Sequence, residues 1–226
     1  MTNDGMTNEH VELETWMLQP PNPCMTNGAR MWDERFRDEG HAYGTQPSHY
    51  LKEKQALLRR GQRALVPADG GGRNGVWLAE QGLSVHAVDI SGEGLARARE
   101  LAAARGVSIA LEQADLLEWA WPVAAFDWVV SVYCHLPAAA RARVHRAMLG
   151  ALKPGGHLLL EAFHVEQLAY HSGGPRDEGM LMTEERLRAD FAEADLIEFR
   201  KERVHLEDSR LHRGPGVLVR LLARRR

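Results

Sequence analysis

The stretch ALVPADGGGRNGVWL, residues 64–78, decides the fold of this chain. It opens on a short apolar run, residues 64–66, that is typical of a buried strand, and it ends on apolar residues that indicate a helix. Between the two, Gly70, Gly72 and Gly75 have the spacing GxGxxG. Glycines let the backbone approach a ligand closely, and the start of a helix offers free N–H groups. This bend therefore predicts a site for a nucleoside-containing ligand.

Outward from the bend, short strands alternate with helices. Asp89 closes the next predicted strand, and Ser91 caps the helix that follows it. The expected strands are residues 64–66, 84–88, 107–111, 126–132 and 156–160, and the helices between them include residues 91–105 and 137–152. Strands separated by helices of about ten to fifteen residues indicate βαβ units and therefore an α/β fold, a parallel sheet with helices on both faces.

The two ends of the chain differ from this repeat. Residues 1–28 are polar and turn-rich, so we expect a flexible extension followed by one folded domain, residues 29–226. A short helix is expected at residues 31–36 and a second helix at residues 48–60, before the first strand. After a helix over residues 183–194, two strand-like runs at 196–206 and 217–223 follow one another without a helix. They predict a terminal antiparallel hairpin.

Composition excludes several classes of protein. The formal net charge is −3, so no basic surface is expected for a nucleic acid. No apolar stretch approaches the roughly 20 residues that span a bilayer, and the N-terminus lacks the features of a secretory signal, so we expect a cytoplasmic protein. Cys24 and Cys134 lie far apart, and the 11 histidines show no HxxxH or HExxH spacing. We therefore expect no metal site.

Three features favour S-adenosylmethionine (AdoMet) over a dinucleotide. Arg73 and Asn74 place two bulky polar side chains where a pyrophosphate needs the backbone close. Asp115 follows the third strand, from where its carboxylate can reach the edge of an adenine ring. After the turn at residues 153–156 the chain ends in the hairpin and does not supply a second βαβ half. Asp89 suits ribose hydroxyls with either ligand, so an NAD(P)-dependent oxidoreductase is the alternative.

These residues make the chain resemble the class I AdoMet-dependent methyltransferases, in particular the branch near the tellurite-resistance and thiopurine methyltransferases. The matching stretches are Trp32-Asp33-Glu34-Arg35-Phe36, Tyr43-Gly44-Thr45, Gly70-Gly71-Gly72-Arg73-Asn74, Val88-Asp89-Ile90-Ser91 and Lys153-Pro154-Gly155-Gly156. The resemblance implies a Rossmann-like, mostly parallel, seven-stranded sheet in the order 3-2-1-4-5-7-6 with the last strand antiparallel. It also implies a small-molecule methyl acceptor, and the branch suggests a thiol, a selenol or a chalcogen oxyanion.

One departure from the family concerns the end of the first strand. The family usually has an acid there, whereas this chain has Val66-Pro67-Ala68. Asp69 is expected to take the place of that acid beside the ammonium group of the cofactor. The altered segment also motivates a second alternative, a non-catalytic regulator that binds AdoMet.

The resemblance implies that cofactor contacts lie on the N-terminal segment and at the strand ends. Aromatic faces of Trp32, Phe36 and Tyr43 would cover the sulfonium. The alternative for Trp32 and Phe36 is the buried stripe of a short helix. The residues expected to bind the cofactor are Trp32, Phe36, Tyr43, Asp69, Gly70, Gly72, Arg73, Asn74, Asp89, Ile90, Asp115, Leu116 and Ser131.

Candidate bases follow the fourth and fifth strands, at the ligand-facing edge of the sheet. His135 suits proton transfer near neutral pH, and its alternative is a histidine that caps the next helix or bonds a loop carbonyl. Glu161 and His164 are the other catalytic candidates. A long glycine-rich loop follows them, which is typical of a functional wall. The residues expected to contact the acceptor are Tyr133, Tyr170 and Arg213, the last of which suits an anion.

Overall fold

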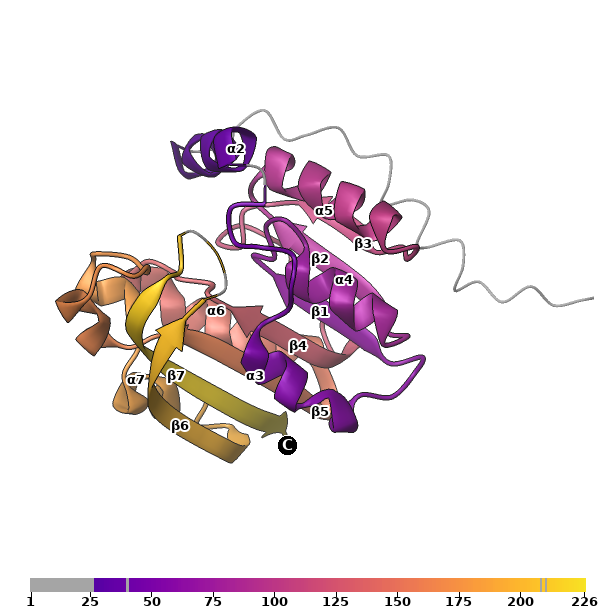
Figure 1. Cartoon of the computed structure of the whole chain (residues 1–226). Coiled ribbons are helices and arrows are strands. Elements are labelled where there is room, and N and C mark those ends of the chain that lie inside the picture. The colour runs from indigo at the N-terminus through magenta and orange to yellow at the C-terminus, as the bar shows by residue number, and fades with distance from the viewer. Residues whose placement is uncertain (1–26, 40, 208, 210) are drawn as a thin grey trace, which may run out of the picture.

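The sheet contains seven strands, as the sequence predicts. In the computed structural model, which describes residues 27–39, 41–207, 209 and 211–226, these are β1 (Arg63–Pro67), β2 (Ser84–Asp89), β3 (Ala110–Gln113), β4 (Phe126–Val132), β5 (Leu152–Phe163), β6 (Ala194–Leu206) and β7 (Gly214–Arg225). They are hydrogen-bonded in the order β3-β2-β1-β4-β5-β7-β6 (Figure 1). β7 runs antiparallel to β5 and β6, and the remaining pairs are parallel. The predicted fold class, strand order and terminal hairpin are confirmed.

Helices cover both faces of this sheet (Figure 1). They are α3 (His49–Glu53), α4 (Arg73–Glu80), α5 (Gly92–Ala104), α6 (Ala138–Ala151) and α7 (Glu184–Asp190), and α2 (Asn27–Glu39) packs against α5. Successive strand residues enter different cores: Leu65 and Val129 pack with α6 and α7, whereas Val66 and Val130 pack with α3 and α4. Burial on both faces explains why these strands are apolar throughout and do not alternate with polar residues.

The helix predicted over residues 48–60 is wrong in its length. α3 ends at Glu53, and a short 3-10 helix, η2 (Gln55–Leu57), follows it. Within α3 the buried residues are Tyr50 and Leu51, whereas no residue of η2 is buried and Leu57 is 45% exposed. An apolar stripe of a single turn cannot hold a long helix against the sheet, because most helix stability comes from such packing.

Other element boundaries also differ from the predicted ones. β3 begins at Ala110 and not at residue 107, because the Val107 N–H group donates to the Ala102 carbonyl (3.0 Å) and so closes the C-terminus of α5. β5 is longer than predicted, and α7 ends at Asp190. The predicted extension, residues 1–28, lies outside the described residues except for residues 27 and 28, which begin α2. Within the described part, no helix is long and apolar enough to cross a membrane.

Gly72 sets the separation of α4 and α5. It has φ +82°, and a Cβ atom there would lie 2.6 Å from the Ala98 Cβ and 2.8 Å from the Ala98 Cα. Gly106 offers a matched comparison, because its φ is +67° and nothing lies within 4 Å of an added Cβ.

We expect Gly106→Ala to lower the free energy of unfolding by about 1–2 kcal/mol, the usual cost of a left-handed non-glycine residue. Gly72→Ala should cost clearly more, because the backbone of α5 must also move. Urea unfolding followed by circular dichroism measures both losses. Equal losses in the two variants would contradict this role of Gly72.

Candidate active site

The bend after β1 is built around the carboxylate of Asp69. Its Oδ1 accepts a hydrogen bond from the Asn74 N–H group (3.3 Å), and its Oδ2 accepts one from the Gly75 N–H group (2.9 Å). A Cβ atom on Gly75 would lie 2.5 Å from that Oδ2. The third glycine of the motif therefore makes room for an acidic side chain at the start of α4, which bonds the N–H groups of the second and third helix residues.

Asp89 holds the same bend from the end of β2. Its Oδ2 accepts from the Gly70 N–H group (2.7 Å) and its Oδ1 from the Ser91 N–H group (2.8 Å). Although these backbone donors oppose the shift, burial raises the pKa of Asp69 to about 7 and that of Asp89 to about 6. Asp69 and Asp89 form an acidic cradle, in which burial disfavours the charged carboxylates and a nearby cation would favour them.

The N-terminal segment brings an aromatic lid, Trp32, Phe36 and Tyr43, onto this bend. α2 packs against the N-terminal end of α5 (Figure 1). The Phe36 ring lies so close to Gly70 that a Cβ there would be 2.5 Å from the ring Cζ. The three rings of the lid have centroids between 6.2 and 6.4 Å apart. The three predicted lid residues are therefore brought together. Phe36 is also buried, as the alternative interpretation of a buried helix stripe predicts.

A second group of rings, the aromatic wall, consists of Tyr133, Phe163 and His212. The Tyr133 centroid lies 4.9 Å from that of Phe163 and 4.7 Å from that of His212. His212 lies 5.0 Å from Tyr43, so the wall and the lid are continuous. The Arg73 guanidinium lies 5.6 Å from the centre of the Tyr133 ring, within the range of a cation–π contact.

Two non-glycine residues with left-handed backbone end β1 and β4. Ala68 and Tyr133 both have φ 55°. The Tyr133 N–H group donates to the Glu161 carbonyl (2.8 Å), which holds the strained residue in place. Strain of this kind is concentrated at functional sites. Both strained residues lie at the carboxyl edge of the sheet, where the sequence predicts the site.

His135 has its two ring nitrogens engaged by backbone groups. Its Nδ1 lies 2.9 Å from the Tyr133 carbonyl oxygen, and its Nε2 accepts from the Phe163 N–H group (3.3 Å). Burial lowers the pKa of His135 to about 4. The neutral ring therefore links the end of β4 to the end of β5 through these two backbone contacts. This arrangement matches the alternative interpretation, a histidine that bonds a loop carbonyl, and does not suit the predicted base.

Glu161 also has partners that a general base should not have. Its Oε1 accepts from the Ser48 Oγ (2.8 Å), and its Oε2 accepts from the Arg220 Nε (2.7 Å). Its side chain is 2% exposed. Because both oxygens are occupied by protein donors, the geometry does not suit the predicted role in proton transfer.

The other predicted catalytic and acceptor residues are His164, Tyr170 and Arg213, and the first two contact other parts of the chain. The His164 Nδ1 accepts from the Glu166 N–H group (3.2 Å) and caps η3 (Val165–Ala169), and burial lowers its pKa. Tyr170 lines a hollow of about 400 Å³ together with Leu168 and Arg203. Arg213 is exposed. The structure therefore does not gather these three side chains at the glycine bend.

On the predicted adenine side, the residues follow β2 and β3. The Asp115 Oδ1 accepts from the Leu117 N–H group (2.9 Å), and the Ile90 carbonyl accepts from the Gln113 Nε2 (3.1 Å). Leu116 is 7% exposed and packs in the core with Leu65 and Val88. Ser131 is buried in β4.

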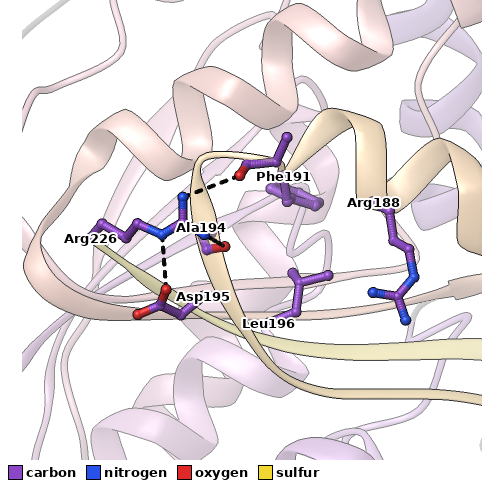
Figure 2. Close-up of a pocket in the computed structure, with 7 residues that line it drawn as sticks. Arg188, Phe191, Ala194, Asp195, Leu196 and Arg226 are labelled. Atoms are coloured by element: carbon purple, nitrogen blue, oxygen red, sulfur yellow. Dashed lines mark hydrogen bonds and ion pairs between the residues drawn. The ribbon is translucent and has the colours of Figure 1, made fainter.

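A hollow of about 410 Å³ lies at the other edge of the sheet (Figure 2). It is lined by Arg188, Phe191, Asp195 and Arg226, among others, where β6 begins and β7 ends. Asp195 binds the Arg226 guanidinium there (2.9 Å). Because β6 is parallel to β5, this hollow is on the amino edge, and it contains none of the predicted site residues.

Residues 64–156 match the family described as "Methyltransferase domain". This segment runs from β1 into β5 and includes the glycine bend, the acidic cradle and Tyr133. No curated protein sequence matches the chain.

Solved structures with the same fold cover most of the chain. One comes from a study of the conversion of a disulfide bond into a thioacetal group during echinomycin biosynthesis (TM-score 0.71, 19% identity, 87% of this chain and 91% of that one). TehB from Haemophilus influenzae is another (0.67, 17%, 86% and 67%). An S-adenosylmethionine-dependent methyltransferase from Mesorhizobium loti is a third (0.55, 24%, 77% and 96%). The chain therefore has the Rossmann-like methyltransferase fold.

AdoMet is the cofactor that the matched domain and this fold imply. The residues present fit it. AdoMet carries a cationic ammonium and a cationic sulfonium, and the acidic cradle offers two buried carboxyl groups whose pKa is raised by burial to about 7 and about 6. The glycine bend lies between the two acids, and aromatic faces that favour cations lie beside it.

Asp69 makes the stability of the chain depend on pH. Its pKa is raised to about 7 from an ordinary value of 3.8. Between about pH 4 and about pH 7 the folded chain keeps a proton that the unfolded chain has lost, so the free energy of unfolding falls as the pH rises. One such proton contributes a slope of up to about 1.4 kcal/mol per pH unit.

We expect Asp69→Asn to remove this part of the slope, because the amide does not titrate. Urea unfolding at several pH values across that window measures it, and Asp38→Asn on the exposed side of α2 is the control. If the free energy of unfolding of Asp69→Asn depends on pH as in the parent chain, Asp69 is not the group that causes this dependence.

Proposed function

We propose that this chain is an AdoMet-dependent methyltransferase that acts on a small molecule. A soft nucleophile, a thiol, a selenol or a chalcogen oxyanion, is the acceptor class that the site favours. The proposal rests on the acidic cradle, in which Asp69 and Asp89 are buried on either side of Gly70.

The acidic cradle favours a cationic ligand over a dinucleotide. A pyrophosphate binds to the free N–H groups at the start of a helix. Here the N–H groups of Asn74 and Gly75 already donate to the Asp69 carboxylate. An anion would have to displace that carboxylate and would then lie beside two buried acids. This argues against the NAD(P)-dependent alternative.

Several residues would hold the cofactor. Asp89 would accept from the ribose hydroxyls, Asp69 would pair with the ammonium group, and Arg73 would pair with the carboxylate. Asp115 would contact the adenine edge, and the aromatic lid would cover the sulfonium. When bound, AdoMet supplies a methyl group to a nucleophile, and the lid and wall would align that nucleophile and exclude water.

The state of the candidate bases supports a soft acceptor. Both ring nitrogens of His135 are bonded to backbone groups, and both oxygens of Glu161 accept from protein donors. A hydroxyl acceptor needs a base to remove its proton, whereas a thiol, with a pKa of about 8.5, is already partly ionised near neutral pH and a selenol more so. The aromatic wall would pack against such an acceptor.

Calorimetry with S-adenosylhomocysteine tests the proposal. We expect binding by the parent chain and, for Asp89→Asn, binding weaker by roughly 10- to 100-fold, because charge-assisted hydrogen bonds contribute about 1.5–3 kcal/mol. NADH is the control ligand. Failure of S-adenosylhomocysteine to bind, or binding of NADH in its place, would overturn the proposal.

Turnover with a panel of thiols, selenols and phenols then tests the acceptor class. We expect methylation of thiols or selenols with AdoMet and little with phenols. Binding of the cofactor without transfer to any member would favour the non-catalytic regulator.

A further inference from the structure

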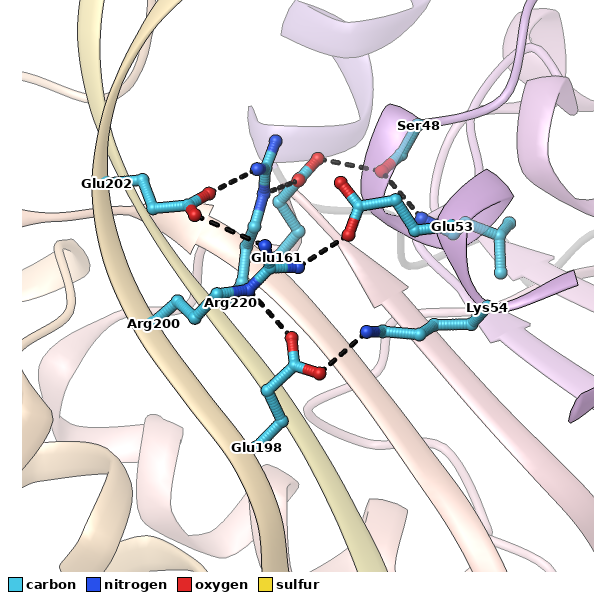
Figure 3. A network of polar contacts seen from close by, with 9 residues as sticks. Ser48, Glu53, Lys54, Glu161, Glu198, Arg200, Glu202 and Arg220 are labelled. Atoms are coloured by element: carbon cyan, nitrogen blue, oxygen red, sulfur yellow. Dashed lines mark hydrogen bonds and ion pairs between the residues drawn. The ribbon is translucent and has the colours of Figure 1, made fainter.

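Glu161 lies at the centre of a polar network that joins the sheet to the N-terminal segment (Figure 3). It faces Arg220 directly across the β5–β7 ladder, and Arg220 binds both Glu161 and Glu202. Glu161 is 2% exposed and Ser48, which donates to it, is 0% exposed. A charged group this deep needs a matched partner, and Arg220 supplies it.

Ser48 contacts the glycine bend as well as Glu161. Its Oγ donates to the Glu161 Oε1 (2.8 Å), and its backbone N–H group donates to the Asn74 Oδ1 (3.0 Å). The Asn74 Nδ2 in turn lies 3.4 Å from the Asp69 Oδ1. A continuous chain of buried hydrogen bonds therefore connects Arg220 on β7 with the acid that we propose as the partner of the ammonium group.

Ser48 also fixes where the aromatic lid is held. It is the N-cap of α3, and its Oγ accepts from the Leu51 N–H group (3.3 Å). Tyr43 of the lid lies five positions before Ser48, so the anchor limits how far that ring can move. The Ser48–Glu161 bond therefore fixes the residue whose backbone N–H group holds Asn74.

An outer set of ion pairs holds α3 against β6. The Lys54 Nζ lies 2.6 Å from the Glu198 Oε2, and an Arg200 amino group lies 2.6 Å from the Glu53 Oε2 (Figure 3). These pairs are partly exposed and do not touch the glycine bend, so they stabilise α3 without setting the position of Asp69. α3 is therefore attached to β6 independently of the bond between Ser48 and Glu161.

We propose that Glu161 is a positioning residue for the cofactor site: through Ser48 and Asn74 it orients Asp69 and anchors the lid. It takes no part in proton transfer. This inference rests on the proposed function and assigns Glu161 a role in cofactor affinity. A base in the same position would affect turnover and leave cofactor affinity unchanged.

Calorimetry with S-adenosylhomocysteine on single and double variants tests the inference. We expect Glu161→Gln and Ser48→Ala each to weaken binding by about tenfold. The amide has one acceptor oxygen for two donors, the Ser48 Oγ and the Arg220 Nε, so it loses one of the two bonds, whereas Ser48→Ala loses the bond to Glu161 together with the cap on Leu51. The double variant should bind less weakly than the two separate losses combined would give, because both changes act on the Ser48–Glu161 bond. Glu202→Gln is the matched control: it also removes a partner of Arg220 but leaves Ser48 bonded, so binding should stay within about twofold.

The pH profile of kcat/KM separates positioning from catalysis. We expect Glu161→Gln to keep the profile of the parent chain, because no titrating group is lost from the reaction. An unchanged affinity for S-adenosylhomocysteine with turnover reduced by about a hundredfold or more would identify a base and overturn the inference.

Ser48→Ala covers the case in which Glu161→Gln does not fold, because it leaves the Glu161–Arg220 pair intact. If Ser48→Ala binds S-adenosylhomocysteine as tightly as the parent chain, the inference fails while the proposed function stands. If the parent chain itself does not bind, the proposed function fails first.

Discussion

Two buried carboxylates hold the bend on which the rest of the site depends. Asp89 reaches across from β2 to the Gly70 N–H group, and Asp69 folds back on the start of α4. Both acids are buried at a cost that the backbone donors only partly offset, as their raised pKa values indicate. A stable fold accepts such a cost at a site where a ligand of opposite charge compensates for it.

We propose that Asp69 takes the place of the acid that the resembled family has at the end of β1. Ala68 takes a left-handed conformation, which turns the chain so that the next side chain points back at α4. The Asp69 Oδ2 bond to Gly75 is 2.9 Å, whereas the contacts of Oδ1 with Asn74 are 3.3 and 3.4 Å. Hydrogen bonds weaken at that length, so Oδ1 is the oxygen better suited to a further donor.

The fold was predictable from sequence because its signals are local. The glycine spacing, the apolar strands and the alternation with helices all lie within short windows, and the resemblance supplied the strand order. Boundaries failed where tertiary packing decided them: η2 has no buried residue to extend α3, and Val107 belongs to the end of α5. The aromatic lid was predictable as a cluster because Trp32 and Phe36 share one helix face.

The roles of Glu161 and His135 were not predictable in the same way, because their partners are distant in sequence. Arg220 is 59 positions from Glu161, and Ser48 is 113 positions away. Residue type and location at a strand end suggest a base. The same strand end also contains the strained Tyr133, whose carbonyl oxygen contacts the His135 ring and whose N–H group donates to the Glu161 carbonyl. Both ring nitrogens of His135 contact backbone groups, and both carboxylate oxygens of Glu161 accept from Ser48 and Arg220, so this geometry does not suit proton transfer by either side chain. The chemistry of the site should then depend on how precisely the lid, the wall and the acidic cradle align an acceptor that is already nucleophilic.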